Sequence, residues 1–173
     1  RTIVGLMDLG ENHPYHNFTV TGTLPDNTTN NEYSSIISNP NARNSALINS
    51  QLMNMGLSPV QDYEQTFARK LDSSQYYYNP RVGFISLSQP LQPDEVLAVA
   101  YQYSYNGKIY KVGEFSQDVP PDSTTSNQKV LFLKLLKATS QRPNLPIWGL
   151  MMKNVYIVGY GTLDRQKFQL NVL

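Results

Sequence analysis

The chain has 173 residues, with 14 Lys and Arg against 13 Asp and Glu, a net charge of +1 and no cysteine. The length suffices for one core without disulfides, and the absent cysteines exclude thiol nucleophiles and cysteine-ligated metals. Because the charge is balanced, the chain has no strong positive field to attract a nucleic-acid backbone. Its apolar runs are far shorter than the roughly 20 residues of a membrane-spanning helix. We therefore expect a single soluble domain over residues 1–173 that does not bind nucleic acid or span a membrane.

Amide groups supply much of the polarity, because the chain contains 16 Asn and 12 Gln alongside 12 Tyr and 11 Pro. We interpret this surface as that of an exported, β-rich protein. The start, Arg1-Thr2-Ile3-Val4, is neither an initiator methionine nor a signal peptide. Alternation of Phe168, Leu170 and Val172 predicts a strand that runs to the last residue. We therefore expect the chain to be a fragment of a longer protein.

In chain order, short strands are predicted over residues 2–7 and 18–22, and a loop over 23–38. A helix is predicted next, with Asn39 as the N-cap, Pro40 at the first helical position and Gly56 as the C-terminal glycine. Between them lies an apolar stripe at i, i+4 and i+7, formed by Ile48, Leu52 and Met55.

A second, weaker helical pattern covers residues 63–71, and β-type patterns follow from Tyr76 onward. Further strands are predicted over residues 82–87, 129–138, 150–158 and 167–173. With about eight strands and one or two short helices, the fold class is mainly β or α+β, in an antiparallel β-sandwich-like domain. Within it, we expect 1–60 as an N-terminal strand, loop and helix subregion and 61–173 as the main β part.

The most specific local pattern is a hairpin, in which strands 95–105 and 108–116 are joined by Asn106-Gly107, the dipeptide of a type I′ turn. A two-residue turn pairs Tyr105 with Lys108 and fixes the register. The further predicted partners on this face are Tyr103 with Tyr110, Tyr101 with Val112, and Val99 with Glu114. The opposite face carries small residues at its base, Ala98, Ala100 and Gly113, and we expect it to pack inward there.

This hairpin also supplies the candidate binding residues. The tyrosine face is expected to be half-exposed, because its rings stand on a two-stranded ribbon. We identify Tyr103, Tyr105 and Tyr110 as candidates for contact with a partner. A role in the core is the alternative for these side chains.

Two histidines could in principle hold a metal, because His13 and His16 lie close to Asp8 and Glu11. Pro14 between them does not fit a helical pair of ligands, however. We interpret this segment as a polar turn in which Asp8 or Glu11 binds backbone amides. A hydrolase that uses His13, His16 and the nearby carboxylates is the alternative hypothesis for this segment.

No other catalytic motif emerges from the sequence. A serine elbow of the Gly-x-Ser-x-Gly type is absent, and Val158-Gly159-Tyr160-Gly161 lacks the third glycine and the following helix of a phosphate-binding loop. We therefore predict a protein that is not an enzyme, with no catalytic residues, no metal and no cofactor.

Aromatic residues suggest one further function. Tyr77 and Trp148 could stack on sugar rings in a carbohydrate- or surface-binding β-sandwich, which is the alternative function. In a strand, however, Tyr77 faces away from Tyr76 and Tyr78, so the three rings cannot form one platform. That arrangement favours packing in the core or in an interface.

The central stretch contains the run Leu91-Gln92-Pro93-Asp94-Glu95-Val96-Leu97-Ala98-Val99-Ala100-Tyr101 and, after the hairpin turn, Tyr110-Lys111-Val112-Gly113-Glu114-Phe115. Five further stretches contribute to the same family resemblance: Gly5-Leu6-Met7-Asp8-Leu9-Gly10-Glu11, Ala68-Arg69-Lys70-Leu71, Tyr77-Tyr78-Asn79-Pro80, Val82-Gly83-Phe84-Ile85-Ser86-Leu87 and Leu150-Met151-Met152-Lys153-Asn154-Val155-Tyr156. Together they make the chain resemble a segment of the SprA/Sov family.

Members of that family are very large outer-membrane proteins of Bacteroidetes that form the translocon of the type IX secretion system and are needed for gliding motility. The resemblance implies a non-enzymatic structural or interaction domain at the outer membrane or cell surface, in the periplasmic or extracellular part. It also implies secreted cargo proteins and other secretion-system subunits as partners. It supplies no catalytic residues.

Overall fold

The structure is a computed structural model that describes residues 1–11, 18–120, 129–152, 164, 166–167 and 169. Its strands are β1 (Thr2–Leu6), β2 (Tyr63–Phe67), β3 (Tyr76–Asn79), β4 (Phe84–Leu87), β5 (Leu97–Val99), β6 (Tyr101–Tyr105), β7 (Lys108–Val112) and β8 (Leu131–Lys137). The helices are α1 (Glu32–Ile37) and α2 (Ile48–Asn54), with two short 3₁₀ helices, η1 (Ser73–Gln75) and η2 (Pro146–Leu150). Within this described part, no helix is long and apolar enough to cross a membrane.

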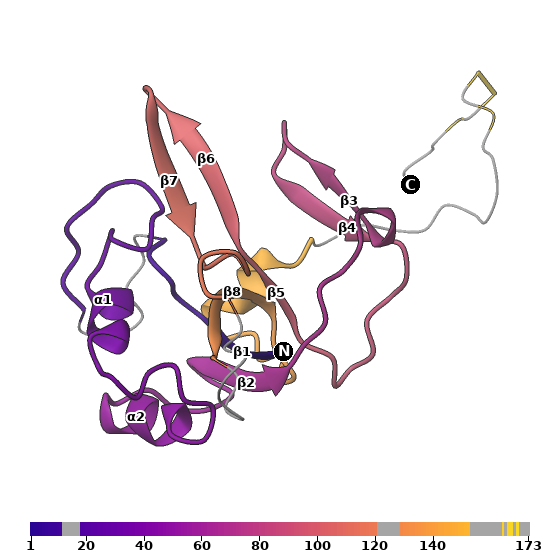
Figure 1. Cartoon of the computed structure of the whole chain (residues 1–173). Coiled ribbons are helices and arrows are strands. Elements are labelled where there is room, and N and C mark those ends of the chain that lie inside the picture. Colours follow the sequence, from indigo (N-terminus) through magenta and orange to yellow (C-terminus); the bar gives the residue numbers. More distant parts are fainter. Residues whose placement is uncertain (12–17, 121–128, 153–163, 165, 168, 170–173) are drawn as a thin grey trace.

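The main sheet has the strand order β2-β1-β8-β5, and two hairpins, β3-β4 and β6-β7, accompany it (Figure 1). The central position of β1 explains why its sequence is a continuous apolar run, because both of its faces are covered. The β-rich α+β class predicted from the sequence is confirmed. The sheet is mixed, however, because β1 runs parallel to β8 while β1-β2 and β5-β8 are antiparallel.

The principal core lies where both helices meet the sheet (Figure 1). Ile36 of α1 and Ile48 and Leu52 of α2 are fully buried, and they belong to one cluster with Val4 of β1 and Phe132 of β8. Fully burying an aliphatic side chain contributes about 1.5–3 kcal/mol, so these contacts position both helices. Two smaller clusters, one around Leu135 and one around Leu131, extend the core along β8.

The predicted helix after Asn39 forms only in its second half. Its apolar stripe and Gly56, at φ +87°, are found as expected, but α2 begins at Ile48. The Asn39 side chain accepts the Asn41 amide at 2.9 Å, and Asn44 accepts the Ala46 amide at 2.9 Å. Such local hydrogen bonds compete with helix formation, which explains the run of turns before α2.

Three other predictions about elements are wrong. The stretch expected to be a helix over 63–71 contains β2, because its alternating residues pair with β1 and tertiary pairing overrides local propensity. The expected loop over 23–38 contains α1. Residues 18–22 make only an isolated bridge, from Val20 to Asn30. The strands predicted over 150–158 and 167–173 lie largely outside the described residues.

The tyrosine hairpin is the most accurate prediction. Tyr105 pairs with Lys108 and Tyr103 with Tyr110, and both turn residues have the positive φ of a type I′ turn, 49° at Asn106 and 76° at Gly107. The Tyr101–Val112 pair is also found.

The predicted register ends there. Gly113 turns the chain away at φ +79°. Val99 consequently pairs with Lys134 of β8 rather than with Glu114.

Candidate functional site

The candidate residues of the β6-β7 hairpin form a ladder of stacked rings. Tyr103 and Tyr110 have centroids 5.2 Å apart and an interplanar angle of 15°, and Tyr101 stacks on Tyr103 at 6.4 Å. Lys108 extends the ladder, with its Nζ 5.2 Å from the centroid of the Tyr110 ring. Burial raises the pKa of Tyr101 to about 12, so this inner ring remains a neutral phenol. The ladder therefore runs from the core towards the surface.

The loop that contains Pro25, Asp26 and Asn27 fixes the position of the hairpin. The Tyr103 hydroxyl donates to the Pro25 carbonyl at 2.7 Å, and the Lys111 amide donates to Asp26 at 2.8 Å. The Asn27 side chain accepts from the amide of Gly113 and donates to its carbonyl. The hairpin is therefore attached to this loop by hydrogen bonds that involve both of its strands.

The outer end of the hairpin is solvent-exposed. Tyr105 is 54% exposed and Ile109, on the opposite face, is 64% exposed. Of the three predicted contact residues, only Tyr105 presents most of its side chain, whereas Tyr103 and Tyr110 are half-buried within the ladder. Ile109 was not predicted as a contact residue, because the sequence indicates an exposed aromatic face and inward packing of the opposite face.

The three consecutive tyrosines of β3 are all exposed. Tyr77 is 60% and Tyr78 54% exposed, and the Tyr77 ring lies 6.1 Å from that of Phe84 on the paired strand β4, with the two rings tilted by 58°. The core alternative for these tyrosines is therefore wrong for this chain by itself. They belong to the β3-β4 hairpin, a second two-stranded ribbon that is separate from the main sheet (Figure 1).

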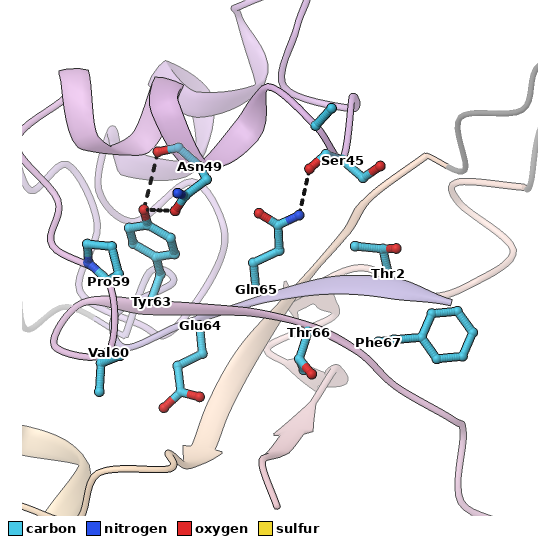
Figure 2. A pocket seen from close by; sticks show the side chains of 11 residues that line it. Thr2, Ser45, Asn49, Pro59, Val60, Tyr63, Glu64, Gln65, Thr66 and Phe67 are labelled. Atoms are coloured by element: carbon cyan, nitrogen blue, oxygen red, sulfur yellow. Dashed lines mark hydrogen bonds between the residues drawn. The ribbon is translucent and has the colours of Figure 1, made fainter. Parts of the chain in front are cut away.

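A hollow of about 550 Å³ lies along β2 (Figure 2). Its wall on the α2 side is held by two hydrogen bonds, from the Tyr63 hydroxyl to Asn49 Oδ1 at 2.5 Å and from Gln65 Nε2 to the Ser45 carbonyl at 2.6 Å. Phe67, at the end of the strand, is 74% exposed. This site was not predicted, because a helix was expected over this stretch, although Tyr63, Gln65 and Phe67 alternate as in a strand.

Acidic side chains gather beneath the surface around Lys134. Lys134 donates to the carbonyl of Met7 and lies 3.4 Å from Glu11 Oε2. Burial raises the pKa of Glu11 to about 7, against the opposing effect of Lys134. Burial also raises the pKa of Glu32 to about 9, with Asp8, Glu11 and Asp62 adding to the shift. These carboxyls stabilise the fold best when some of them are protonated.

The turn at Asp8 behaves as predicted. Asp8 Oδ1 accepts the amides of Gly10 and Glu11 at 3.1 and 3.3 Å, and Glu11 Oε2 accepts the Leu9 amide at 2.9 Å. His13 and His16 lie outside the described residues. Within the described ranges, no group of three or more acidic or histidine side chains has the geometry to hold a metal ion.

Comparison with known proteins adds no identification. Neither a scan against models of protein families nor a search of the curated proteins finds a match for this chain. The candidate site is therefore defined by the structure alone. It consists of the two exposed ribbons that carry Tyr77 and Tyr105, and of the hollow along β2.

Proposed function

We propose that residues 1–173 are a non-enzymatic structural and interaction segment of a type IX secretion translocon, at the outer membrane and cell surface. The stretches that resemble the SprA/Sov family support the assignment to this system. The observation that carries the interaction role is the exposure of Tyr77, Tyr105 and Ile109 on two ribbons. Aromatic side chains are enriched in protein interfaces, which favours a contact role for the exposed tyrosines.

Rigidity of the supporting structure fits this role. The stacked rings of Tyr101, Tyr103 and Tyr110 and the hydrogen bond to Pro25 fix the hairpin before a partner arrives. A surface held in one conformation loses less entropy on binding, which increases affinity. The proposed partners are secreted cargo proteins and other subunits of the secretion system.

An in-frame deletion of residues 1–173 from the gene that encodes them tests this function. The proposal expects cargo to accumulate inside the cells while the rest of the protein is still made and inserted. Secretion at the wild-type level in the deletion strain would reject the proposal.

A carbohydrate-binding role is the second candidate, and the observation in its favour is the exposed ring of Tyr77. Trp148, the other ring proposed for stacking, is half-buried in η2 next to the buried Ile147. Binding to a glycan array that is lost in both Tyr77→Ala and Trp148→Ala would support this role. An array with no bound glycan counts against it.

A further inference from the structure

Among the described residues no strand pairs with the outer edge of β2, because β2 is an end strand of the main sheet. Main-chain bonds join Arg1 with Ala68 in both directions at 2.8 Å, and the Met7 amide bonds to the Asp62 carbonyl at 2.8 Å. In an antiparallel pair such bonded positions alternate. The amides and carbonyls of the intervening residues, among them Gln65 and Phe67, therefore point away from β1.

The open stretch begins after Tyr63. The Tyr63 carbonyl accepts the Val60 amide at 2.8 Å, so the turn before β2 covers the first outward position. No residue in the described ranges bonds to the main chain of Gln65 or Phe67 on this side. An edge of this kind is a template for a further strand.

The hollow provides space along the same edge (Figure 2). All five residues of β2 line the hollow, so it extends along the whole length of the strand. It is an open groove of about 550 Å³ rather than an enclosed cavity, which suits an extended segment better than a small molecule. Phe67 stands exposed at one end and Val60 at the other, which gives an added strand apolar contacts at both ends.

Charge indicates what kind of strand fits. Arg69 and Lys70 follow β2 after Ala68 and are exposed, and Arg69 also donates to Gln75 Oε1 at 3.1 Å. The acidic residue of the strand, Glu64, lies on the other face, where its Oε1 accepts from the amide and hydroxyl of Thr139 at 2.7 and 2.9 Å. The open edge is therefore cationic at its Phe67 end and complements a carboxylate on the incoming chain.

We propose that the outer edge of β2 binds an extended, acidic segment of a partner polypeptide by strand addition. The backbone of that segment bonds to the amides and carbonyls of Gln65 and Phe67, and an apolar side chain covers Phe67. The biological source of the segment, cargo or a neighbouring subunit, rests on the proposed function. Strand addition itself does not depend on the proposed function. The binding test in solution and the secretion test in cells can therefore give independent results.

The test uses the 173-residue chain and a synthetic peptide in which valine and threonine alternate between terminal glutamates. Amide hydrogen exchange is followed by NMR with and without this peptide. We expect slower exchange at Gln65 and Phe67 on peptide addition, whereas Glu64 and Thr66, which bond to β1, are already protected. A matched peptide methylated on alternate backbone nitrogens cannot donate to the edge and is expected not to protect these amides. A lysine-ended peptide is expected to bind more weakly.

Substitutions at the edge provide the second measurement. Phe67→Pro removes one outward donor and is expected to weaken peptide binding by about fivefold or more, the effect of one lost hydrogen bond. Phe67→Ser keeps the donor, removes the apolar contact and weakens binding less. Val82→Ser is the control, because Val82 is 73% exposed but lies outside the hollow.

Two results would overturn the inference. One is unchanged exchange at Gln65 and Phe67 in excess glutamate-ended peptide. The other is protection of the same amides that increases with protein concentration in the absence of peptide, because a second copy of the chain would then occupy the edge.

Discussion

Arg43 and Glu114 form a two-point ion pair, with Nη2 2.6 Å from Oε1 and Nη1 2.7 Å from Oε2. Buried Glu114 also accepts the Tyr33 hydroxyl at 2.5 Å and the Phe132 amide at 2.8 Å. Arg43→Ala leaves this carboxylate without its cation, so we expect the free energy of unfolding to fall by about 3 kcal/mol. Chemical denaturation monitored by circular dichroism measures the change.

The control for this prediction is an exposed ion pair. Lys111 lies 3.0 Å from Asp118, and both side chains are accessible to solvent, which screens their interaction. Lys111→Ala should therefore destabilise the protein far less than Arg43→Ala. Equal effects of the two substitutions would show that the Glu114 network does not hold the core together.

Stability is expected to decrease with increasing pH because of Glu32. Its pKa is about 9 in the folded protein, against 4.5 for an ordinary glutamate, so the folded state retains the proton more strongly than the unfolded chain. Its contribution to stability is complete below pH 4.5 and is lost as the pH rises towards 9. Denaturation measured across this window should show a steady fall in the free energy of unfolding.

Glu32→Gln isolates that contribution from other titrating groups, because the amide resembles the protonated carboxyl at every pH. The difference in stability between the variant and the natural sequence should increase in favour of the variant from pH 4.5 to 9. A difference that does not depend on pH would mean that Glu32 titrates alike in both states.

Tyr103 and Tyr105 differ in what their hydroxyls contact. The Tyr103 hydroxyl donates to the Pro25 carbonyl, whereas Tyr105 is exposed at the end of the hairpin. Tyr103→Phe should reduce the free energy of unfolding by about 1 kcal/mol, the net value of one hydrogen bond. Tyr105→Phe should leave it unchanged. A loss of the same size in both variants would contradict the attachment of the hairpin through Pro25.

Gly10 and Gly107 both have positive φ, +85° and +76°, but only Gly10 is closely packed. A Cβ at Gly10 would lie 1.8 Å from the Asp26 carbonyl oxygen, whereas Gly107 has open space. Gly107→Ala should therefore cost about 1 kcal/mol from backbone strain, and Gly10→Ala considerably more. Thermal unfolding of the two variants compares them directly, and a higher melting temperature for Gly10→Ala than for Gly107→Ala would contradict this packing.

Local sequence explains which parts of the fold could be predicted. Asn106-Gly107 determines its own turn, and the register of Tyr103 with Tyr110 follows from it without reference to the rest of the chain. The capping by Asp8 is equally local. The helix after Asn39 was predicted too long, because asparagine side chains bind nearby amides in ways that a helical pattern does not reveal.

Pairings between distant segments could not be predicted. The hollow along β2 depends on pairing of Tyr63–Phe67 with a strand more than fifty residues earlier, and Glu114 meets Arg43 across 71 positions. Nothing in the sequence of either segment identifies its partner. The exposed Ile109 was missed for a related reason, because alternation defines two faces of a hairpin but not which of them the body of the protein covers.

Secretion by cells that carry surface substitutions in the full-length protein is the sharpest test of the proposed role of the ribbons in binding partners. Tyr105→Ser combined with Ile109→Ser removes the exposed apolar side chains of one ribbon. Met53→Ser is the control, because Met53 lies on α2 and is as exposed as Tyr105. We expect extracellular cargo to fall towards the level of the deletion strain in the double variant and to be unchanged in Met53→Ser, with both proteins present at wild-type amounts. Equal secretion by the double variant and the control would contradict this role.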